Sequence, residues 1–119
     1  GNVLIQGSAG FVDGQLDGYQ ADIAFVSSVG LSRQPDGYVP DYVRNTVAAT
    51  GAKTVIPIHW DDFFVKLDAD TPALPRVMED LYASFDLLDV ELEKLGTSLT
   101  YMRPMETIYF RASPEQIAP

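Results

Sequence analysis

The sequence contains no cysteine and few basic residues, and each shortage excludes a class of function. Without cysteine there can be no disulfide framework, no thiolate zinc site and no cysteine nucleophile. The 8 Lys and Arg residues stand against 17 Asp and Glu, so the formal net charge is -9, and no basic cluster offsets it locally. Because this charge repels a polyanionic backbone, we expect no nucleic-acid partner.

Long apolar runs are also lacking. No stretch approaches the ~18 apolar residues that a membrane span needs. The N-terminus shows no basic region followed by an apolar one, which a signal peptide would require. We therefore expect a cytoplasmic protein with no membrane span, and the length of 119 residues with 46% hydrophobic residues predicts a single core.

The start of the chain is unusual for a domain boundary. After Gly1 and Asn2, the sequence enters the apolar run Val3-Leu4-Ile5 at once. Such a run is typical of a buried strand rather than of a frayed terminus. This pattern indicates a fragment of a longer protein.

Apolar, β-branched runs predict three strands, at residues 3–6, 21–27 and 53–58, with a glycine-rich loop over residues 7–18 between the first two. Two further strands are expected at residues 98–102 and 106–110. The element order is then ββαβαββ, an α/β arrangement. We expect residues 1–111 to form the folded unit and residues 112–119 to form a loose tail.

Two helices are predicted between these strands. Pro40 is suited to the first turn of a helix that ends before Gly51, with Val43 and Val47 on its buried face. A longer amphipathic helix is expected from Pro75 to Leu95, stopped by Gly96. Its apolar residues recur every three or four positions, namely Met78, Leu81, Phe85, Leu88, Leu92 and Leu95.

His59 is the only histidine and follows directly after the third strand. A lone histidine is more often structural than catalytic, but the end of a strand in an α/β fold is where ligands and metals gather. Trp60 and Asp61 come next. Asp61 is a candidate to orient the imidazole, and Trp60 is either a core residue or a wall of a substrate pocket. A zinc site usually needs three or four protein ligands, so other ligands must come from outside this chain.

The segment Thr54 to Phe63, TVIPIHWDDF, resembles the strand that carries the last metal-binding histidine of the metallo-β-lactamase-fold hydrolases. The frame formed by VLIQGSAGF, a loop, ADIAFVSSVG, a helix and IPIHW is similar to the second half of that fold. The similarity extends to the branch that includes lactonase-like and N-acyl-phosphatidylethanolamine-phospholipase-like enzymes. The similarity is good over residues 2–64, whereas the rest of the chain shares only the general pattern of the fold.

The resemblance implies a four-layer αββα sandwich, of which this chain is the C-terminal half. It also implies a Zn²⁺ or Mn²⁺ site at one edge of the sheets, to which His59 contributes. In such enzymes a metal-bound hydroxide attacks an ester, lactone, amide or phosphodiester of a small-molecule substrate. The HxHxDH motif that supplies most of the ligands belongs to the first half and is absent here, so we expect the isolated chain to be inactive.

One position departs from the family pattern. The family places a metal-bridging aspartate in the turn after its corresponding strand, whereas this sequence has Ser8 within Gly7-Ser8-Ala9-Gly10. A serine hydroxyl is a poor bridge between two divalent ions. The whole enzyme would then hold one metal, recruit Asp13, or have lost catalysis, and Ser8 itself has a plainer interpretation as a small turn residue.

Two functions of different classes remain open. The first is a segment of a metal-dependent hydrolase. The second is a non-catalytic half-fold that serves as an interaction or dimerisation module. A bare inner sheet face containing Val3, Ile5, Ile23, Phe25 and Val55 would favour a homodimer with the two sheets opposed and the helix of residues 75–95 outside.

Overall fold

Four parallel strands form the centre of the structure, a computed structural model that describes residues 1–66 and 72–111. Their order in the sheet is β1-β2-β3-β4, and every neighbouring pair is parallel. The strands span Val3–Gln6 (β1), Ile23–Ser27 (β2), Thr54–Ile58 (β3) and Ser98–Leu99 (β4). The predicted α/β class and the first three strands are confirmed.

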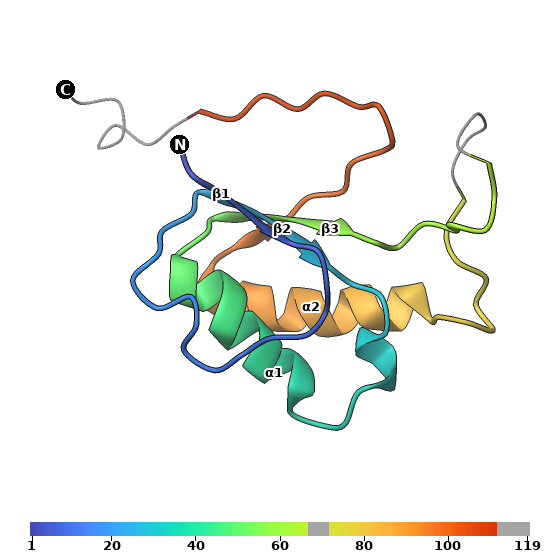
Figure 1. Cartoon of the computed structure of the whole chain (residues 1–119), viewed down its shortest axis with the longest axis horizontal. Helices are drawn as coiled ribbons and strands as arrows, with labels where there is room; N and C mark the ends of the chain where they lie inside the picture. Colours follow the sequence, from blue (N-terminus) through green and yellow to red (C-terminus); the bar gives the residue numbers. More distant parts are fainter. Residues whose placement is uncertain (67–71, 112–119) are drawn as a thin grey trace.

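The end of the chain differs from the prediction of two closing strands. The first is only the two-residue β4, which pairs with Thr54 and Val55, and residues 106–110 form no strand. The described order is therefore ββαβαβ. Residues 101–111 instead return across the sheet on the side opposite the helices (Figure 1). The predicted tail, residues 112–119, lies outside the described residues.

Both α-helices lie on one side of the sheet (Figure 1). The first, α1, spans Tyr38–Val43 and continues as a π-helical segment, η2, over Arg44–Ala48. A short 3-10 helix, η1, covers Leu31–Arg33 before it, and the second helix, α2, spans Leu81–Leu95. None of the described helices is long and apolar enough to cross a membrane.

The start of α2 corrects the expected boundary at Pro75. Residues 76–78 form a turn, and the helix begins only after Asp80, whose carboxylate accepts a hydrogen bond from the Ala83 backbone N–H at 3.2 Å. This side-chain cap satisfies one of the free N–H groups of the first turn. At the other end, Gly96 adopts a left-handed φ of 67°, so the predicted glycine stop is confirmed.

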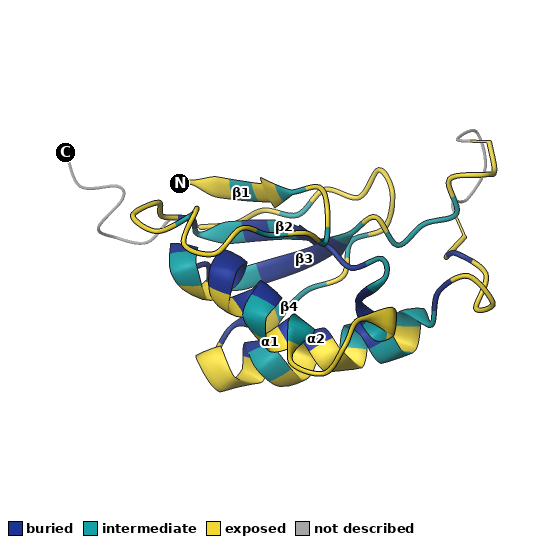
Figure 2. Ribbon diagram, turned by 60° about the horizontal axis from the view of Figure 1, so that its bottom comes forward, coloured by how far each residue is buried: buried dark blue, intermediate teal, exposed yellow. Residues whose placement is uncertain are grey.

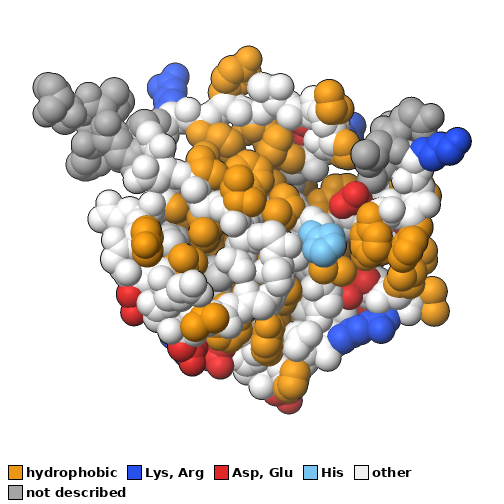
Figure 3. All heavy atoms as spheres, in the orientation of Figure 1, with side chains coloured by type: hydrophobic (Ala, Val, Ile, Leu, Met, Phe, Trp, Pro, Cys, Tyr) orange, Lys and Arg blue, Asp and Glu red, His pale blue; other side chains and the backbone are white. Residues whose placement is uncertain are grey.

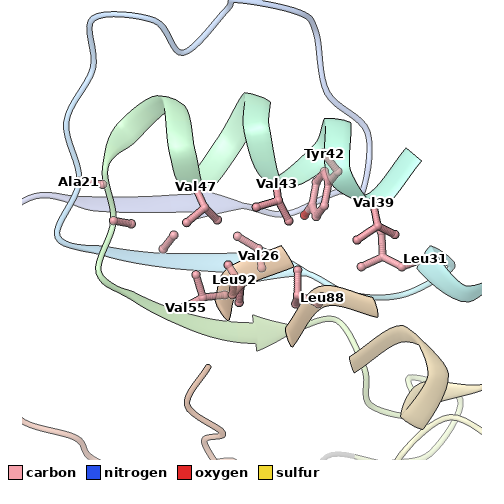
Figure 4. Close-up of a cluster of buried hydrophobic side chains, with 12 residues drawn as sticks. Ala21, Val26, Leu31, Val39, Tyr42, Val43, Val47, Val55, Leu88 and Leu92 are labelled. Atoms are coloured by element: carbon pink, nitrogen blue, oxygen red, sulfur yellow. The ribbon is translucent and has the colours of Figure 1, made fainter. Parts of the chain in front are cut away.

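The core lies between the sheet and these helices (Figure 4). Alternate residues of the strands point into it, among them Ala24 and Val26 of β2 and Val55 of β3, each with no exposed surface. Val43 and Val47 are buried as predicted, at 3% and 1% exposure. Val55 was expected on the opposite, open face of the sheet. That prediction is wrong, because Val55 pairs with Ala24 in parallel register and so faces the helices.

The open face of the sheet is partly covered by the returning segment. Met102 and Arg103 border a shallow hollow with Phe25 and Ile56, and Phe110 borders another with Val3 and Ile23. Ile56 is only 1% exposed. The edge strand β1 stays open, with Val3 at 55% and Ile5 at 70% exposure (Figure 2). The expectation that β1 is a buried strand is therefore wrong for the face that carries Val3 and Ile5.

The loop between β1 and β2 takes the place of a crossover helix. Residues 7–22 contain no helix or strand, yet parallel strands usually need a helical connection. Side chains of the first helical segment hold this loop instead. The Tyr38 hydroxyl donates to the Ala9 carbonyl at 2.6 Å, and Asn45 accepts from the Gly14 N–H at 3.0 Å. Phe11 packs against the Tyr38 ring at 5.4 Å.

Glu79 ties the beginning of α2 to the turn after β2. Its side chain is 2% exposed and accepts hydrogen bonds from the Gly30 N–H at 2.9 Å and the Ser32 hydroxyl at 3.1 Å. The Ser84 hydroxyl donates to the same carboxyl group. Three donors from two distant segments therefore meet at one buried acceptor.

Replacing Glu79 by Ala should destabilise the fold by about 3 kcal/mol, because buried donors that lose their acceptor keep their desolvation cost. The measurement is urea unfolding followed by circular dichroism. Glu93→Ala is the matched control, since Glu93 is an exposed glutamate within α2, and it should change the free energy of unfolding by less than about 0.5 kcal/mol. Equal unfolding midpoints for the two variants would contradict this role of Glu79.

Candidate metal-ligand site at the carboxyl edge of the sheet

The carboxyl ends of the three longer strands meet at one edge of the sheet. Gln6, Val26 and Pro57 are register partners, and Ser27 is paired with Ile58. Because the strands are parallel, the residues that follow them gather at the same edge. His59 follows β3 there, next to Ser27 at the end of β2.

The His59 imidazole is exposed and is held through one ring nitrogen. Its Nδ1 lies 3.3 Å from the Ser27 hydroxyl, and Ser27 is fully buried. The ring also contacts Phe63 at 5.8 Å between centroids. No residue within 1–66 or 72–111 hydrogen bonds to Nε2. In the tautomer that donates from Nδ1 to Ser27, the Nε2 lone pair is free to bind a metal.

Ser27 is itself fixed by neighbouring hydrogen bonds. The Tyr42 hydroxyl donates to the Ser27 carbonyl at 2.9 Å. Burial, with a smaller contribution from Tyr38, raises the pKa of the Tyr42 phenol, so the hydroxyl stays protonated. The Ser28 N–H and hydroxyl both donate to the Ile58 carbonyl, at 3.0 and 3.2 Å. The backbone on both sides of the imidazole contact is therefore held in place.

Sequence reasoning did not single out Ser27. The only signal was a polar residue at the end of an apolar run, which by itself also fits a loop start. Its significance depends on the pairing of β2 with β3, which places Ser27 opposite Ile58.

Asp61 and Trp60 lie just beyond the imidazole. Asp61 is half-buried and forms an isolated antiparallel bridge with Ala73. No hydrogen bond joins its carboxylate to His59 in the described part of the chain, so its orienting role stays a prediction. The Trp60 carbonyl accepts from the Leu74 N–H at 3.1 Å. The Trp60 side chain borders a cavity of about 320 Å³. This position fits the second interpretation of the residue, as a wall of a pocket.

Ser8 lies in a turn near the same edge. Its hydroxyl accepts from the Gly10 N–H at 3.1 Å, and Gln6 donates to the Ser8 and Gly10 carbonyls at 3.0 and 2.7 Å. Asp13 accepts from the Asn45 side chain at 3.0 Å. Among the described residues, no hydrogen bond or ion pair joins Ser8 or Asp13 to His59. These contacts fit the interpretation of Ser8 as a turn residue.

A complete metal site does not form from the described residues alone. Within them, no group of three or more His, Cys, Asp or Glu side chains comes together in a way that could hold a metal ion. Tight zinc sites use three or four protein ligands. Among the described residues at this edge, the His59 imidazole is the candidate nitrogen donor, and the expectation that further ligands come from elsewhere stays a prediction.

Comparison with protein-family models, with curated proteins and with solved structures finds no match to this chain. The functional interpretation thus depends on the geometry at this edge of the sheet and on the sequence resemblance.

The backbone at His59 carries strain. Its φ is 58°, in the left-handed region that residues other than glycine rarely adopt. Such strain costs on the order of 1–2 kcal/mol for a residue with a Cβ atom. Strained residues of this kind cluster at binding and catalytic sites, where the surrounding structure holds them.

We predict that His59→Gly is more stable than His59→Ala by about 1 kcal/mol, since both variants lack the imidazole and only glycine relieves the strain. Chemical unfolding measures the difference. The same pair at Glu93, within α2, should show the opposite order by about 1 kcal/mol, because glycine weakens a helix interior. If His59→Gly were the less stable of its pair, the strained backbone would not be a property of the protein in solution.

Proposed function

We propose that this chain is the C-terminal half of a metal-dependent hydrolase, in which His59 binds a divalent metal ion such as Zn²⁺ or Mn²⁺ through Nε2. The remaining ligands would come from a preceding half of the protein. The observation that carries the proposal is the imidazole itself: exposed at the carboxyl edge of a parallel sheet, held at Nδ1 by a buried serine, and without a partner at Nε2 among the described residues.

Each part of this arrangement has a chemical purpose in the proposal. A hydrogen bond donated from Nδ1 orients the ring and raises the basicity of Nε2 as a metal ligand, and the Ser27 hydroxyl can accept such a bond. The positive φ at His59 turns the backbone directly after β3. A bound metal would supply Lewis-acid activation of water and of an ester, lactone, amide or phosphodiester. This chain would contribute the orientation of one ligand and the neighbouring wall at Trp60.

Zinc binding to the isolated chain should be weak and confined to His59, because one nitrogen ligand does not make a tight site. Since His59 is the only histidine, a ¹⁵N-edited NMR titration of its imidazole with Zn²⁺ reports on the ring alone. Ser27→Ala should weaken this binding by about ten-fold and shift the tautomer balance. Ser28→Ala is the control, since its hydroxyl bonds the Ile58 carbonyl and not the ring.

Two results would overturn this assignment. Near-stoichiometric zinc retained through dialysis by the isolated chain would mean that further ligands are present. Equal zinc affinity of the Ser27→Ala and Ser28→Ala variants would remove Ser27 from its positioning role. In a longer protein with both halves, His59→Ala should abolish hydrolysis while the fold persists, and unchanged turnover would refute the hydrolase proposal.

A second candidate function is supported by a different observation, the exposed apolar edge of the sheet. Val3 and Ile5 of β1 are 55% and 70% exposed, and β1 is also an unpaired edge of the described sheet. Exposed apolar strands at a sheet edge favour association. The chain would then be an interaction module that forms a homodimer through the exposed apolar side chains of β1.

For this second candidate, light scattering at tens of micromolar should give a dimer, and Ile5→Glu should convert it to a monomer with unchanged circular dichroism. Val90→Glu is the control, because Val90 is 53% exposed on α2, on the helical side of the sheet. A monomeric wild-type chain that binds no apolar dye would exclude the module, and the segment of residues 101–111 would then suffice to cover the sheet.

A further inference from the structure

A cavity of about 320 Å³ lies between the beginning of α2 and the segment that leaves β4. Its walls combine aromatic and aliphatic side chains from three separate parts of the chain, namely Trp60, Leu74, Leu81, Phe85, Tyr101 and Met102. The Phe85 and Tyr101 rings pack together at 5.1 Å between centroids. Ligand pockets in proteins are concave, largely apolar and of about 300 Å³ or more, so this cavity is of suitable size and lining.

Among the described charged groups that border this cavity, only a positive one is available to bind a ligand. Glu79 borders it, but its carboxyl group is buried and already accepts from three donors. Two arginines lie at the rim. Arg76 forms an ion pair with Asp80 at 3.6 Å, whereas the Arg103 guanidinium makes no hydrogen bond or ion pair with any residue in the described ranges. A free guanidinium beside an apolar cavity favours an anionic group there, against the net charge of -9 of the whole chain.

The cavity adjoins the His59 site. Trp60, Met102 and Arg103 also border a shallower hollow of about 350 Å³ that includes His59 and Asp61. A molecule whose apolar part fills the cavity therefore has its polar end at Arg103, next to the edge where the imidazole lies. Figure 3 shows the histidine at the molecular surface with hydrophobic side chains close to it.

We propose that this cavity binds a small amphipathic carboxylate, an aromatic or branched acyl acid of about ten non-hydrogen atoms, with its carboxylate on Arg103. The size follows from the cavity volume, since a water molecule occupies about 30 Å³ of liquid. The binding of such an acid depends on the cavity alone. Its role as part of a substrate rests on the proposed function. Binding and substrate role are therefore tested separately.

The test uses 4-phenylbutyrate and its uncharged counterpart 4-phenylbutanol as probes, on the metal-free chain. Trp60 is the only tryptophan, so its fluorescence and its single indole N–H signal in NMR report directly from the cavity wall. The acid should change both signals saturably, with a dissociation constant of about 1 mM. It should bind about five-fold more tightly than the alcohol, as an exposed ion pair provides.

Three variants locate the site. Arg103→Gln should bind acid and alcohol equally, because it removes the cation and leaves the walls. Phe85→Ala should weaken both probes about ten-fold through lost apolar contact. Leu87→Ala is the matched control on the same helix, since Leu87 borders a different hollow with Leu31 and Val39. This variant should bind both probes as tightly as the wild type does.

The proposal is overturned if the acid causes no saturable change up to about 10 mM. It is also overturned if the wild type binds the alcohol as tightly as the acid, or if Phe85→Ala and Leu87→Ala weaken binding alike. These outcomes are independent of zinc. Loss of probe binding leaves the His59 assignment standing, and failure of zinc to bind at His59 leaves the carboxylate site standing.

Discussion

Parallel alignment of the strands is the constraint on which the other features depend. Each strand must begin at the same edge as its neighbour, so every connection has to carry the chain back across the sheet. The connections from β2 to β3 and from β3 to β4 do so with α1 and α2, which fall on one side and build the core there. The connection from β1 to β2 does so with a loop that the side chains of Tyr38 and Asn45 hold in place. All carboxyl ends then meet at one edge, and that edge receives Ser27 and His59.

The position of α2 depends on Glu79 in a similar way. Leu88 and Leu92 bury one face of the helix, but apolar packing alone is tolerant of sliding along the helix axis. The buried carboxyl group removes this freedom, because it joins Ser84 of the helix to Gly30 and Ser32 after β2. Directional hydrogen bonds to a buried acceptor fix one position.

Sequence reasoning located elements whose signals are local and missed features that depend on pairing. Apolar runs identified β1, β2 and β3, and spacing of three and four identified α2 as far as its glycine stop. The face of Val55 could not be predicted, since KTVIPI is apolar on both sides and gives no alternation. The start of α2 was misplaced because Pro75 and Asp80 both fit a helix beginning. Ser27 and Glu79 required contacts with residues 32 to 49 positions away. His59 could be singled out as a candidate because its position after a strand is visible in one segment.

The left-handed backbone at His59 links the imidazole to the cavity. At an ordinary extended residue the chain would continue β3 in a straight line, and Trp60 would follow the strand direction. A positive φ at His59 turns the chain instead, and the turn is held by the contact of the His59 imidazole with Ser27 and by the Trp60–Leu74 backbone hydrogen bond at the next residue. With one contact at the strained residue and one hydrogen bond at the residue after it, the imidazole and the Trp60 backbone have little room to move independently. The orientation of the imidazole and the placement of the Trp60 wall are therefore set by the same turn, and a displacement of one requires a displacement of the other.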